Sequence, residues 1–391
     1  MKRTDVDVAV IGGGVVGLSA ALMAARQGLQ VALVEAHEPN AWNAESPDLR
    51  VYALALDNEA LLDSFGLWQD IAARRAYPYA AMTVFDEVQA SPLHFHAGEL
   101  GRGHLGHIVE NDLLVDVLWQ AVCREPGIRR HCPERLAALD NDSDGVHVRL
   151  AGGAEFSARM AFGADGAASK VRQVLGIGVS EHDYRQKGVV AFLETALPHR
   201  HTAWQRFLST GPLAFLPFGE RRCSIVWSLP TERAEDMLAL PPEAFCRALD
   251  SAFAGTLGET RLLSARAAFP LRRRLAAETL KGRVLLLGDA AHAVHPLAGQ
   301  GVNLGLRDVS SLRDALQAAK AGGDALDLRR LQRWARTRHS ENAVAAHAYE
   351  NINRLFSNDN MALSLVRGHL LGLADRLSPL KNTLARIAAG V

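Results

Sequence analysis

The N-terminal part of the chain holds a strand, a glycine-rich loop, a helix and a second strand, and this order leaves few folds open. Residues 6–11 are a β-branched apolar run, residues 12–17 are Gly-Gly-Gly-Val-Val-Gly, and residues 15–26 have helical apolar spacing. A second apolar run at 31–34 is followed by Glu35. Such a βαβ unit is typical of domains that bind a dinucleotide. The sequence therefore predicts an α/β protein built on a Rossmann-like domain.

The glycines of this loop have distinct expected roles. Gly12 permits a tight turn, Gly14 lets a pyrophosphate approach the backbone, and Gly17 lets the helix pack closely on the strand. The helix N-terminus offers free N–H groups and a positive dipole to phosphates, and the Glu35 carboxylate can accept from ribose hydroxyls. Glycine-rich turns also arise for packing reasons alone, and this loop does not distinguish NAD from FAD.

A second loop, after an apolar run at 284–287, favours FAD. Asp289 follows that run, and an acid at the carboxyl end of a strand faces the crevice where ligands of open α/β sheets bind. We expect it to accept from a ribityl or ribose hydroxyl. The backbone of Gly299, Gln300 and Gly301, at the start of a helix near Val302, would face a flavin edge where negative charge appears on reduction. The alternative is a glycine-rich helix entry without a ligand.

A third stretch, residues 163–172, places Asp165 between two glycines ahead of a basic helix start. Asp165 could cap that helix. A capped turn with solvated Lys170 and Arg172 explains the stretch as well as a binding role does.

Composition excludes several classes of protein. Lys plus Arg and Asp plus Glu number 43 each, so no overall charge attracts nucleic acid. The four cysteines lie far apart without a CxxC pair, which argues against a metal cage or a disulfide framework and fits a reducing cytoplasm. No apolar run is long enough to span a bilayer, so we expect no stable membrane insertion.

The pattern changes between residues 187 and 266 to short strands divided by Pro and Gly. We interpret this stretch as a mixed β-sheet domain inserted into the Rossmann-like FAD-binding domain. The expected FAD-binding domain comprises 1–75, 101–178 and 268–335, the expected substrate-binding sheet domain comprises 76–100 and 179–267, and C-terminal helices fill 336–391.

The three elements, in this order, resemble the single-component FAD-dependent aromatic hydroxylases, of which p-hydroxybenzoate hydroxylase is a member. Residues 295–305, His-Pro-Leu-Ala-Gly-Gln-Gly-Val-Asn-Leu-Gly, resemble the run that sets the ubiquinone-biosynthesis hydroxylases apart. Further matching stretches are 105–114, 204–207, 211–217 and 269–271. The resemblance spans nearly the whole chain, and no second GxGxxG is present for the nicotinamide cofactor.

The resemblance implies roles for individual residues. The stretch 296–301 would line the isoalloxazine, which makes Pro296, Gly299, Gln300 and Gly301 the candidate catalytic positions. Arg50 matches an arginine near the moving flavin ring, and Asp165 and Arg172 match a motif linked to FAD and to the nicotinamide cofactor. The residues expected to bind cofactor are Gly12, Gly14, Val15, Val16, Gly17, Glu35, Ala36, Arg50, Asp165, Arg172, Asp289, Pro296, Gly299, Gly301, Val302 and Asn303.

The resemblance also implies an activity: an FAD-dependent monooxygenase that hydroxylates the aromatic ring of a polyprenylphenol intermediate in ubiquinone biosynthesis, using NADH or NADPH and O2. The same fold could instead hydroxylate a small soluble aromatic or reduce prenyl double bonds. A flavin-binding scaffold subunit without turnover is the alternative of another class. Because a polyprenylated phenol is lipophilic, the cytoplasmic protein could attach to the inner membrane face or to a ubiquinone-biosynthesis complex.

Several side chains have two possible roles. Five aromatic residues of the inserted sheet could form an apolar wall over the flavin, although each is more often a core residue: Trp204, Phe207, Phe215, Phe218 and Trp227. His292 and His295 could move protons, but we expect them to serve packing in the loop. The resemblance places Glu110 and Asn111 in a stretch that faces the flavin, but the alternative that we favour is that Asn111 caps a helix at 111–124. Residues 361–391 resemble a basic amphipathic helix that could dock on a membrane surface or cover the flavin domain.

Overall fold

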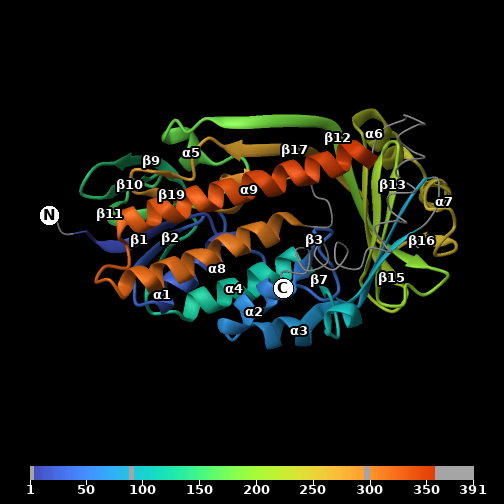
Figure 1. Ribbon diagram of the computed structural model, residues 1–391, viewed down its shortest axis with the longest axis horizontal. Coiled ribbons are helices and arrows are strands. Elements are labelled where there is room, and N and C mark those ends of the chain that lie inside the picture. The colour runs from blue at the N-terminus through green and yellow to red at the C-terminus, as the bar shows by residue number, and fades with distance from the viewer. Residues whose placement is uncertain (1–3, 88–91, 295–299, 357–391) are drawn as a thin grey trace.

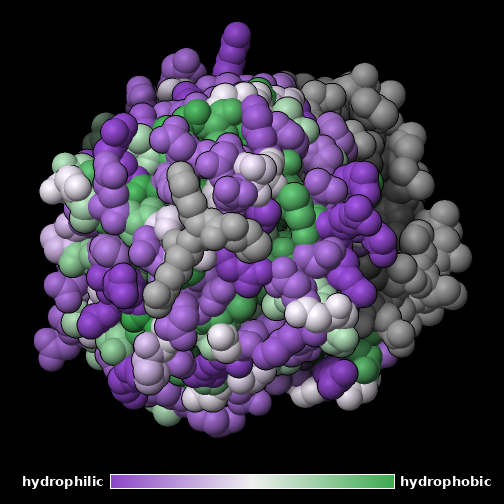
Figure 2. Space-filling model, turned by 90° about the vertical axis from the view of Figure 1, so that its left-hand side faces the viewer, coloured by the Kyte–Doolittle hydropathy of each residue, from purple (hydrophilic) through white to green (hydrophobic). Residues whose placement is uncertain are grey.

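The protein contains two large sheets joined into one elongated molecule, with helices packed along the first of them (Figure 1). The computed structural model describes residues 4–87, 92–294 and 300–356. The end of the molecule formed by the first sheet has a mostly hydrophilic surface with scattered apolar residues (Figure 2). No helix within the described ranges is long and apolar enough to cross a membrane.

The first sheet is a parallel sheet at its centre, as the apolar runs predict. Its strand order is β18-β19-β11-β1-β2-β8. β1 (Val6–Ile11) pairs in parallel with β2 (Val31–Val34) and with β11 (Glu155–Gly163), which pairs in parallel with β19 (Val284–Leu286). The register aligns the last residues of three strands, Ile11, Gly163 and Leu286. The three loops singled out in the sequence therefore leave the sheet at the same edge.

Helices α1 (Val15–Arg26), α4 (Asn111–Arg124) and α8 (Gln300–Lys320) cover one face of this sheet, and α9 (Leu328–Phe356) packs against α8. Ten of the twelve residues of α1 are buried, many of them alanines that let neighbouring helices approach closely. The hairpin of β9 (Leu136–Asn141) and β10 (Val146–Leu150) extends the sheet beside β11.

The second sheet has the order β20-β17-β12-β15-β14-β13-β5-β6 and is mixed, because β13 and β5 pair in parallel. Its central strand β12 (Val179–Thr195) pairs along much of its length with β17 (Ala267–Ala276). β17 thus extends the second sheet past residue 267, where the sequence suggested a boundary. The domain boundaries themselves stay a proposal.

Two helices on the second sheet were missed in the sequence. They are α6 (Thr231–Ala239) and α7 (Pro242–Ala252), which bury Ala234, Phe245 and Leu249 against the sheet. The apolar residues of α7 have helical spacing, but both helices are short and lie between strands, so the whole stretch was interpreted as strands.

A third, small sheet has the order β3-β7-β4, with β3 (Val51–Ala55), β7 (Gly106–Glu110) and β4 (Ala76–Tyr79). It lies next to α2 (Leu56–Ser64) and α3 (Trp68–Arg75). The pairing of β4 with β7 separates residues 76–79 from the second sheet, with which they were grouped in the sequence.

Most helix bounds agree with the predictions from the sequence, and one cap does not. α1 and α4 have the predicted bounds, and α8 begins at Gln300, two residues before Val302. The N-cap of α4 is Glu110 rather than Asn111, which is already helical, so the predicted cap is wrong. The predicted tail helix at 361–391 lies outside the described residues.

The remaining described elements are β5 (Ala81–Asp86), β6 (Leu93–His96), η1 (Ala97–Leu100), β8 (Ile128–His131), α5 (Lys170–Val174), β13 (Thr202–Leu208), β14 (Gly211–Pro217), β15 (Arg222–Pro230), β16 (Thr260–Leu262), β18 (Leu280–Lys281), η2 (Gly288–Ala290) and β20 (His292–Ala293).

Candidate active site

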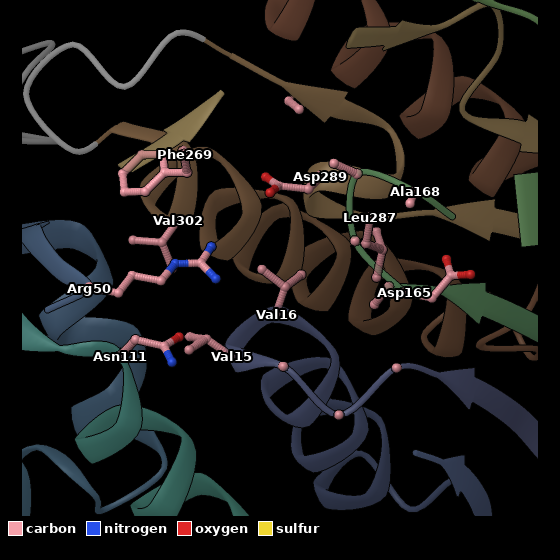
Figure 3. A pocket seen from close by; sticks show the side chains of 18 of the residues that line it. Val15, Val16, Arg50, Asn111, Asp165, Ala168, Phe269, Leu287, Asp289 and Val302 are labelled. Atoms are coloured by element: carbon pink, nitrogen blue, oxygen red, sulfur yellow. The ribbon is translucent and has the colours of Figure 1, made fainter. Parts of the chain in front are cut away.

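A cavity of about 1270 Å³ lies where the carboxyl edge of the first sheet meets the second sheet. Gly14 and Asp289, from loops 275 positions apart in the chain, both line it. Other lining residues come from β3 and from the second sheet. Figure 3 shows the Arg50 and Asp289 side chains directed towards the same space, with Val16 beneath them. The cavity is large enough for a dinucleotide together with part of a second molecule.

The glycine-rich loop forms a cradle on one side of the cavity. Gly12 has φ +112°, and a Cβ there would collide with the carbonyl of Ala164. A Cβ on Gly17 would collide with the Gly12 carbonyl, so α1 packs as closely on β1 as the sequence predicts. A Cβ on Gly14, in contrast, would meet nothing within 4 Å. Gly14 therefore borders open space where a pyrophosphate can approach the start of α1, which no side chain caps.

Glu35 lies at the end of β2 and lines the same side of the cavity with Ala36. Its carboxylate accepts hydrogen bonds from the backbone N–H groups of Gly13 and, at 3.1 Å, His37. These bonds fix the carboxylate against the glycine-rich loop. A carboxylate has four lone-pair positions, so Glu35 can still accept from ribose hydroxyls.

Asp289 lies in η2, directly after β19, with its carboxylate directed into the cavity (Figure 3). Burial raises the pKa of this carboxyl, and the positive charges of Arg50 and His292 oppose the rise only in part. No hydrogen bond from the described part of the chain satisfies the carboxylate. A half-buried acceptor of this kind, directed into a cavity, is suited to a ligand hydroxyl.

Asp165 both caps a helix and borders the cavity. One carboxylate oxygen accepts from the backbone N–H groups of Lys170 at 2.6 Å and Val171 at 3.0 Å, at the start of α5. Ser169 is the N-cap of the same helix and accepts from Arg172 N–H at 3.0 Å. The other Asp165 oxygen is buried without a partner among the described atoms, which leaves it for a ligand in the cavity.

Arg172 holds two loops together and does not line the cavity. Its guanidinium donates to the carbonyl of Ala290 at 2.8 Å and to the carbonyl of Ala167 at 2.7 Å. Burial and the nearby Arg274 lower its pKa. The structure thus gives this arginine a positioning role between the Asp165 loop and the Asp289 loop.

The first turn of α8 enters the cavity through Gly301 and Val302. Asn303 is fully buried behind them and does not line the cavity. Its side chain donates to the Ala53 carbonyl at 2.8 Å and accepts from the Ala55 N–H at 3.0 Å. Asn303 therefore aligns the start of α8 with β3.

Four positions of the second loop lie wholly or partly outside the described residues. Pro296, Gly299 and His295 lie outside the described residues, and only the helical backbone is described for Gln300. Their predicted roles at the isoalloxazine stay predictions.

A buried ionic cluster beneath the second loop fixes Gly288. Asp308 of α8 accepts from Gly288 N–H at 3.0 Å and lies 2.6 Å from His292 Nε2. It also accepts from Arg338 of α9 at 2.8 Å. Burial favours the neutral carboxyl, but His292 and Arg338 outweigh it and lower the pKa of Asp308 to about 2. The packing role expected of His292 agrees with this contact.

Tyr52 and Asn111 line the cavity, and sequence reasoning missed the first of them. The Tyr52 hydroxyl donates to Asn111 Oδ1 at 3.0 Å. Burial raises the pKa of Tyr52 to about 12, against a lowering by Arg50. Side chains two positions apart share one face of a strand, so the spacing from Arg50 could have identified Tyr52.

The apolar wall of the cavity consists of other residues than those expected. It is lined by Val190, Leu216, Val226, Phe269 and Leu271. The five aromatic residues proposed from the sequence pack elsewhere: Phe215 and Trp227 in one core cluster with Trp204 against it, and Phe207 and Phe218 in another. Because successive side chains of a strand face opposite ways, Leu216 and Val226 take the cavity face when Phe215 and Trp227 take the core face.

These features define the class of protein. An open cradle at Gly14, an unsatisfied carboxylate at Asp289 and an apolar wall beside them fit FAD with an aromatic substrate. The fold agrees: p-nitrophenol 4-monooxygenase PnpA from Pseudomonas putida DLL-E4 superposes with a TM-score of 0.78 at 20% identity, covering 97% of this chain and 96% of that chain. The chain therefore has the fold of a solved monooxygenase, and its cavity offers the features that FAD and an aromatic substrate require.

Sequence comparisons narrow the class to a family. The family model described as "FAD binding domain" matches residues 5–346. Ubiquinone hydroxylase UbiL of Rhodospirillum rubrum is 36% identical over 98% of this chain and 89% of its own length. The 3-demethoxyubiquinol 3-hydroxylase of Escherichia coli is 35% identical over 100% of both chains. This chain therefore belongs to the FAD-dependent ubiquinone-hydroxylase family, whose members are monooxygenases that typically use NAD(P)H.

Proposed function

We propose that this enzyme hydroxylates the aromatic ring of a polyprenylphenol intermediate of ubiquinone biosynthesis, using FAD, NADH or NADPH, and O2. The observation that carries the proposal is the single cavity that joins the glycine cradle and Asp289 to an apolar wall from the second sheet. The names of the relatives from Rhodospirillum rubrum and Escherichia coli support the choice of a ubiquinone precursor.

Different residues along this cavity would bind different parts of FAD. The Gly14 cradle and the start of α1 would hold the pyrophosphate, and Glu35 would hold the adenosine ribose. Asp289 would accept from a hydroxyl between the pyrophosphate and the ring system. When bound, FAD supplies electron transfer from NAD(P)H and transfer of one oxygen atom from O2 to the phenol ring. The apolar wall would exclude the water that diverts such chemistry to hydrogen peroxide.

Tyr52 is suited to orient the phenol. Its hydroxyl proton is engaged by Asn111, so the phenolic oxygen can accept from a substrate hydroxyl at the cavity surface. The high pKa of about 12 keeps Tyr52 neutral at physiological pH. A neutral acceptor would position the substrate hydroxyl without placing a negative charge beside the electron-rich ring.

Quinone profiling of a strain that lacks this gene tests the proposal. We expect a prenylated precursor lacking one ring hydroxyl to accumulate, and the wild-type gene but not its Gly14→Val variant to restore ubiquinone. Normal ubiquinone with accumulation of a small soluble aromatic would exclude the proposed substrate.

We propose further that the protein attaches peripherally to the membrane or to a ubiquinone-biosynthesis complex, because a polyprenyl tail partitions into lipid. Residues 361–391, with leucines and basic side chains, are the candidate contact. Flotation with liposomes should carry the full chain upward and leave a chain truncated after residue 356 behind. Equal flotation of both would exclude a role for this segment.

A further inference from the structure

We propose that Glu59, His104 and His107 form a zinc site between α2 and β7, separate from the cavity that holds the candidate flavin site. Their three ligand atoms all lie within 4.8 Å of one another. Glu59 Oε2 lies 3.1 Å from His104 Nε2, and Glu59 Oε1 lies 2.6 Å from His107 Nδ1. None of the three residues lines the cavity.

The three side chains come from elements that the fold holds in place. Glu59 lies in α2, and His107 lies in β7, the central strand of the small sheet, where its backbone pairs with both Leu54 and Pro78. The rings of Trp68 and His107 pack in a T-shaped arrangement, with centroids 4.9 Å apart. Two of the three ligands are therefore positioned before any metal binds.

His104 supplies the adaptable third ligand. It lies in the loop before β7, where Gly101 adopts φ +66° and a Cβ on Gly103 would meet nothing within 4 Å. The side chains of Glu59 and His107 are 10% and 12% exposed, whereas that of His104 is 35% exposed. The site is thus closed on the protein side and open to water on the other, which leaves a position for a fourth, solvent ligand.

The donor set determines the class of metal. Two imidazole nitrogens and one carboxylate oxygen favour a borderline transition-metal ion over magnesium or calcium, which prefer oxygen ligands throughout. Neighbouring ligand atoms on a tetrahedral zinc with bonds of roughly 2.0–2.1 Å lie about 3.3 Å apart. The distances of 2.6 Å and 3.1 Å join the two histidines to different oxygens of Glu59, and the three ligand atoms lie within 4.8 Å of one another, so modest side-chain rotations would bring them to that spacing.

Zinc at this place would fasten α2 to β7, and α2 also holds the start of α8. Asn58, next to Glu59, donates to Asn303 Oδ1 at 2.8 Å, and Asp57 forms an ion pair with Arg307 at 2.5 Å. A metal that binds only the folded chain raises its stability by mass action. We therefore expect zinc to stabilise α2, the helix whose residues Asn58 and Asp57 contact α8.

The test is a Zn²⁺ titration of the tag-free, chelator-treated FAD-loaded protein by isothermal titration calorimetry. We expect one zinc per chain, with binding weakened roughly tenfold or more in Glu59→Gln and in His104→Ala. His104 is a loop residue outside the cavity, so His104→Ala should keep its FAD and its zinc-free turnover. The matched control is His147→Gln, which alters a histidine 3.6 Å from the carboxylate of Asp142 and should leave zinc binding unchanged.

Two further measurements distinguish a zinc site from a cluster that is held together by hydrogen bonds alone. Zinc should raise the melting temperature of the wild type and of His147→Gln but not of Glu59→Gln, and X-ray absorption at the zinc edge should show two imidazole ligands. Absence of saturable binding in the wild type, or equal affinity in all variants, would reduce the cluster to a carboxylate that accepts hydrogen bonds from two histidines.

Discussion

Asp289 occupies a place where the folded chain alone does little to stabilise its charge. Burial raises the pKa of its carboxyl, and among the residues that the structure describes Arg50 and His292 oppose the rise. At neutral pH the ionised form therefore costs the ligand-free fold stability that a bound hydroxyl would restore. Residues that lower stability without a ligand are frequent at functional sites.

Asp289→Asn should stabilise the apoprotein and weaken FAD binding. A carboxyl whose pKa is raised by folding favours the fold below its unfolded pKa, near 3.8, and loses that contribution as the pH rises through the raised value. The variant should thus melt higher than wild-type apoprotein at pH 7, and the difference should vanish towards pH 4. FAD affinity should fall about ten- to hundredfold through the lost charged hydrogen bond. A lower melting temperature of the variant apoprotein at pH 7 would contradict this account of Asp289.

Gly14→Val should abolish FAD retention without unfolding the protein. The added side chain meets no protein atom near its Cβ but fills the space beside the start of α1. We expect the purified variant to be colourless, Gly14→Ala to retain FAD weakly, and both apoproteins to melt within about 2 °C of the wild type. The measurement is the ratio of flavin to protein absorbance after gel filtration. A fully loaded Gly14→Val protein would show that the pyrophosphate lies elsewhere.

Single residues were predictable where backbone geometry demands their type, and less so elsewhere. Gly12 and Gly17 stand where any Cβ collides with backbone, and the loop pattern identified them. The contacts of Arg172 with Ala167 and Ala290 depend on two loops that meet only in the folded chain. No local pattern encodes such a meeting, so its positioning role became visible only in the structure.

At the scale of elements, the Asp308 cluster joins η2, β20, α8 and α9 beneath the second loop. Asp308 accepts from Gly288, faces His292 and pairs with Arg338, and all three side chains are buried. Fixing Gly288 fixes the residue that precedes Asp289. The cluster thus connects helix packing to the geometry of the cavity.

Asp308→Ala should destabilise the protein by about 3–5 kcal/mol, because it removes the buried carboxylate that faces His292 and leaves Arg338 with the more exposed Glu341 as its ion-pair partner. The matched control is Asp324→Ala, which removes an ion pair of 2.7 Å with Arg159 but is half exposed and should cost less than about 1 kcal/mol. Urea unfolding at pH 7 measures both. Equal losses would mean that burial of the Asp308 cluster is unimportant.

The same cluster predicts acid sensitivity. Folding lowers the pKa of Asp308 from 3.8 to about 2, so its contribution is fully present above pH 3.8 and is lost as the pH falls towards 2. The stability difference between the wild type and Asp308→Asn should shrink across that window. A difference that stays constant from pH 5 to pH 2 would contradict the lowered pKa.

Elements with strong apolar periodicity were predicted well. β1, α1, β2 and α4 agree with the sequence to the residue, and β19 is parallel as expected. The pairing partners of β4 and β17 were not predicted, because strand pairing depends on contacts between segments far apart in the chain. Phe215 and Trp227 lie in a core cluster, as expected for each aromatic taken singly, and the cavity wall that they could have formed contains Leu216 and Val226 instead. Alternation gives two faces of a strand but does not say which one meets a cavity.

On the scale of the whole molecule, the cavity depends on how the second sheet is placed against the carboxyl edge of the first. β12 and β17 lead from the first sheet into the second and carry Val190 and Phe269 to the cavity wall (Figure 1). The class of fold followed from the order of motifs along the chain. The shape of the wall did not, because it is made where two sheets meet.

Leu216→Asn should uncouple the enzyme. A polar side chain in the apolar wall admits water, so NAD(P)H would still be oxidised while hydrogen peroxide replaces part of the hydroxylated product. Leu216→Met, which keeps the wall apolar, should remain coupled. FAD content should be unchanged in both. Full coupling in Leu216→Asn would mean that this wall does not protect the reaction.

Incorporation of labelled oxygen tests the central claim most directly. The FAD-loaded protein is supplied with NAD(P)H, ¹⁸O₂ and a prenylated phenol precursor in detergent or liposomes, and the product is examined by mass spectrometry. We predict one ¹⁸O atom in the ring for each NAD(P)H consumed, and no product from Gly14→Val. Oxidation of NAD(P)H without label in the ring, or a ring hydroxyl derived from water, would contradict a flavin monooxygenase that acts on this substrate.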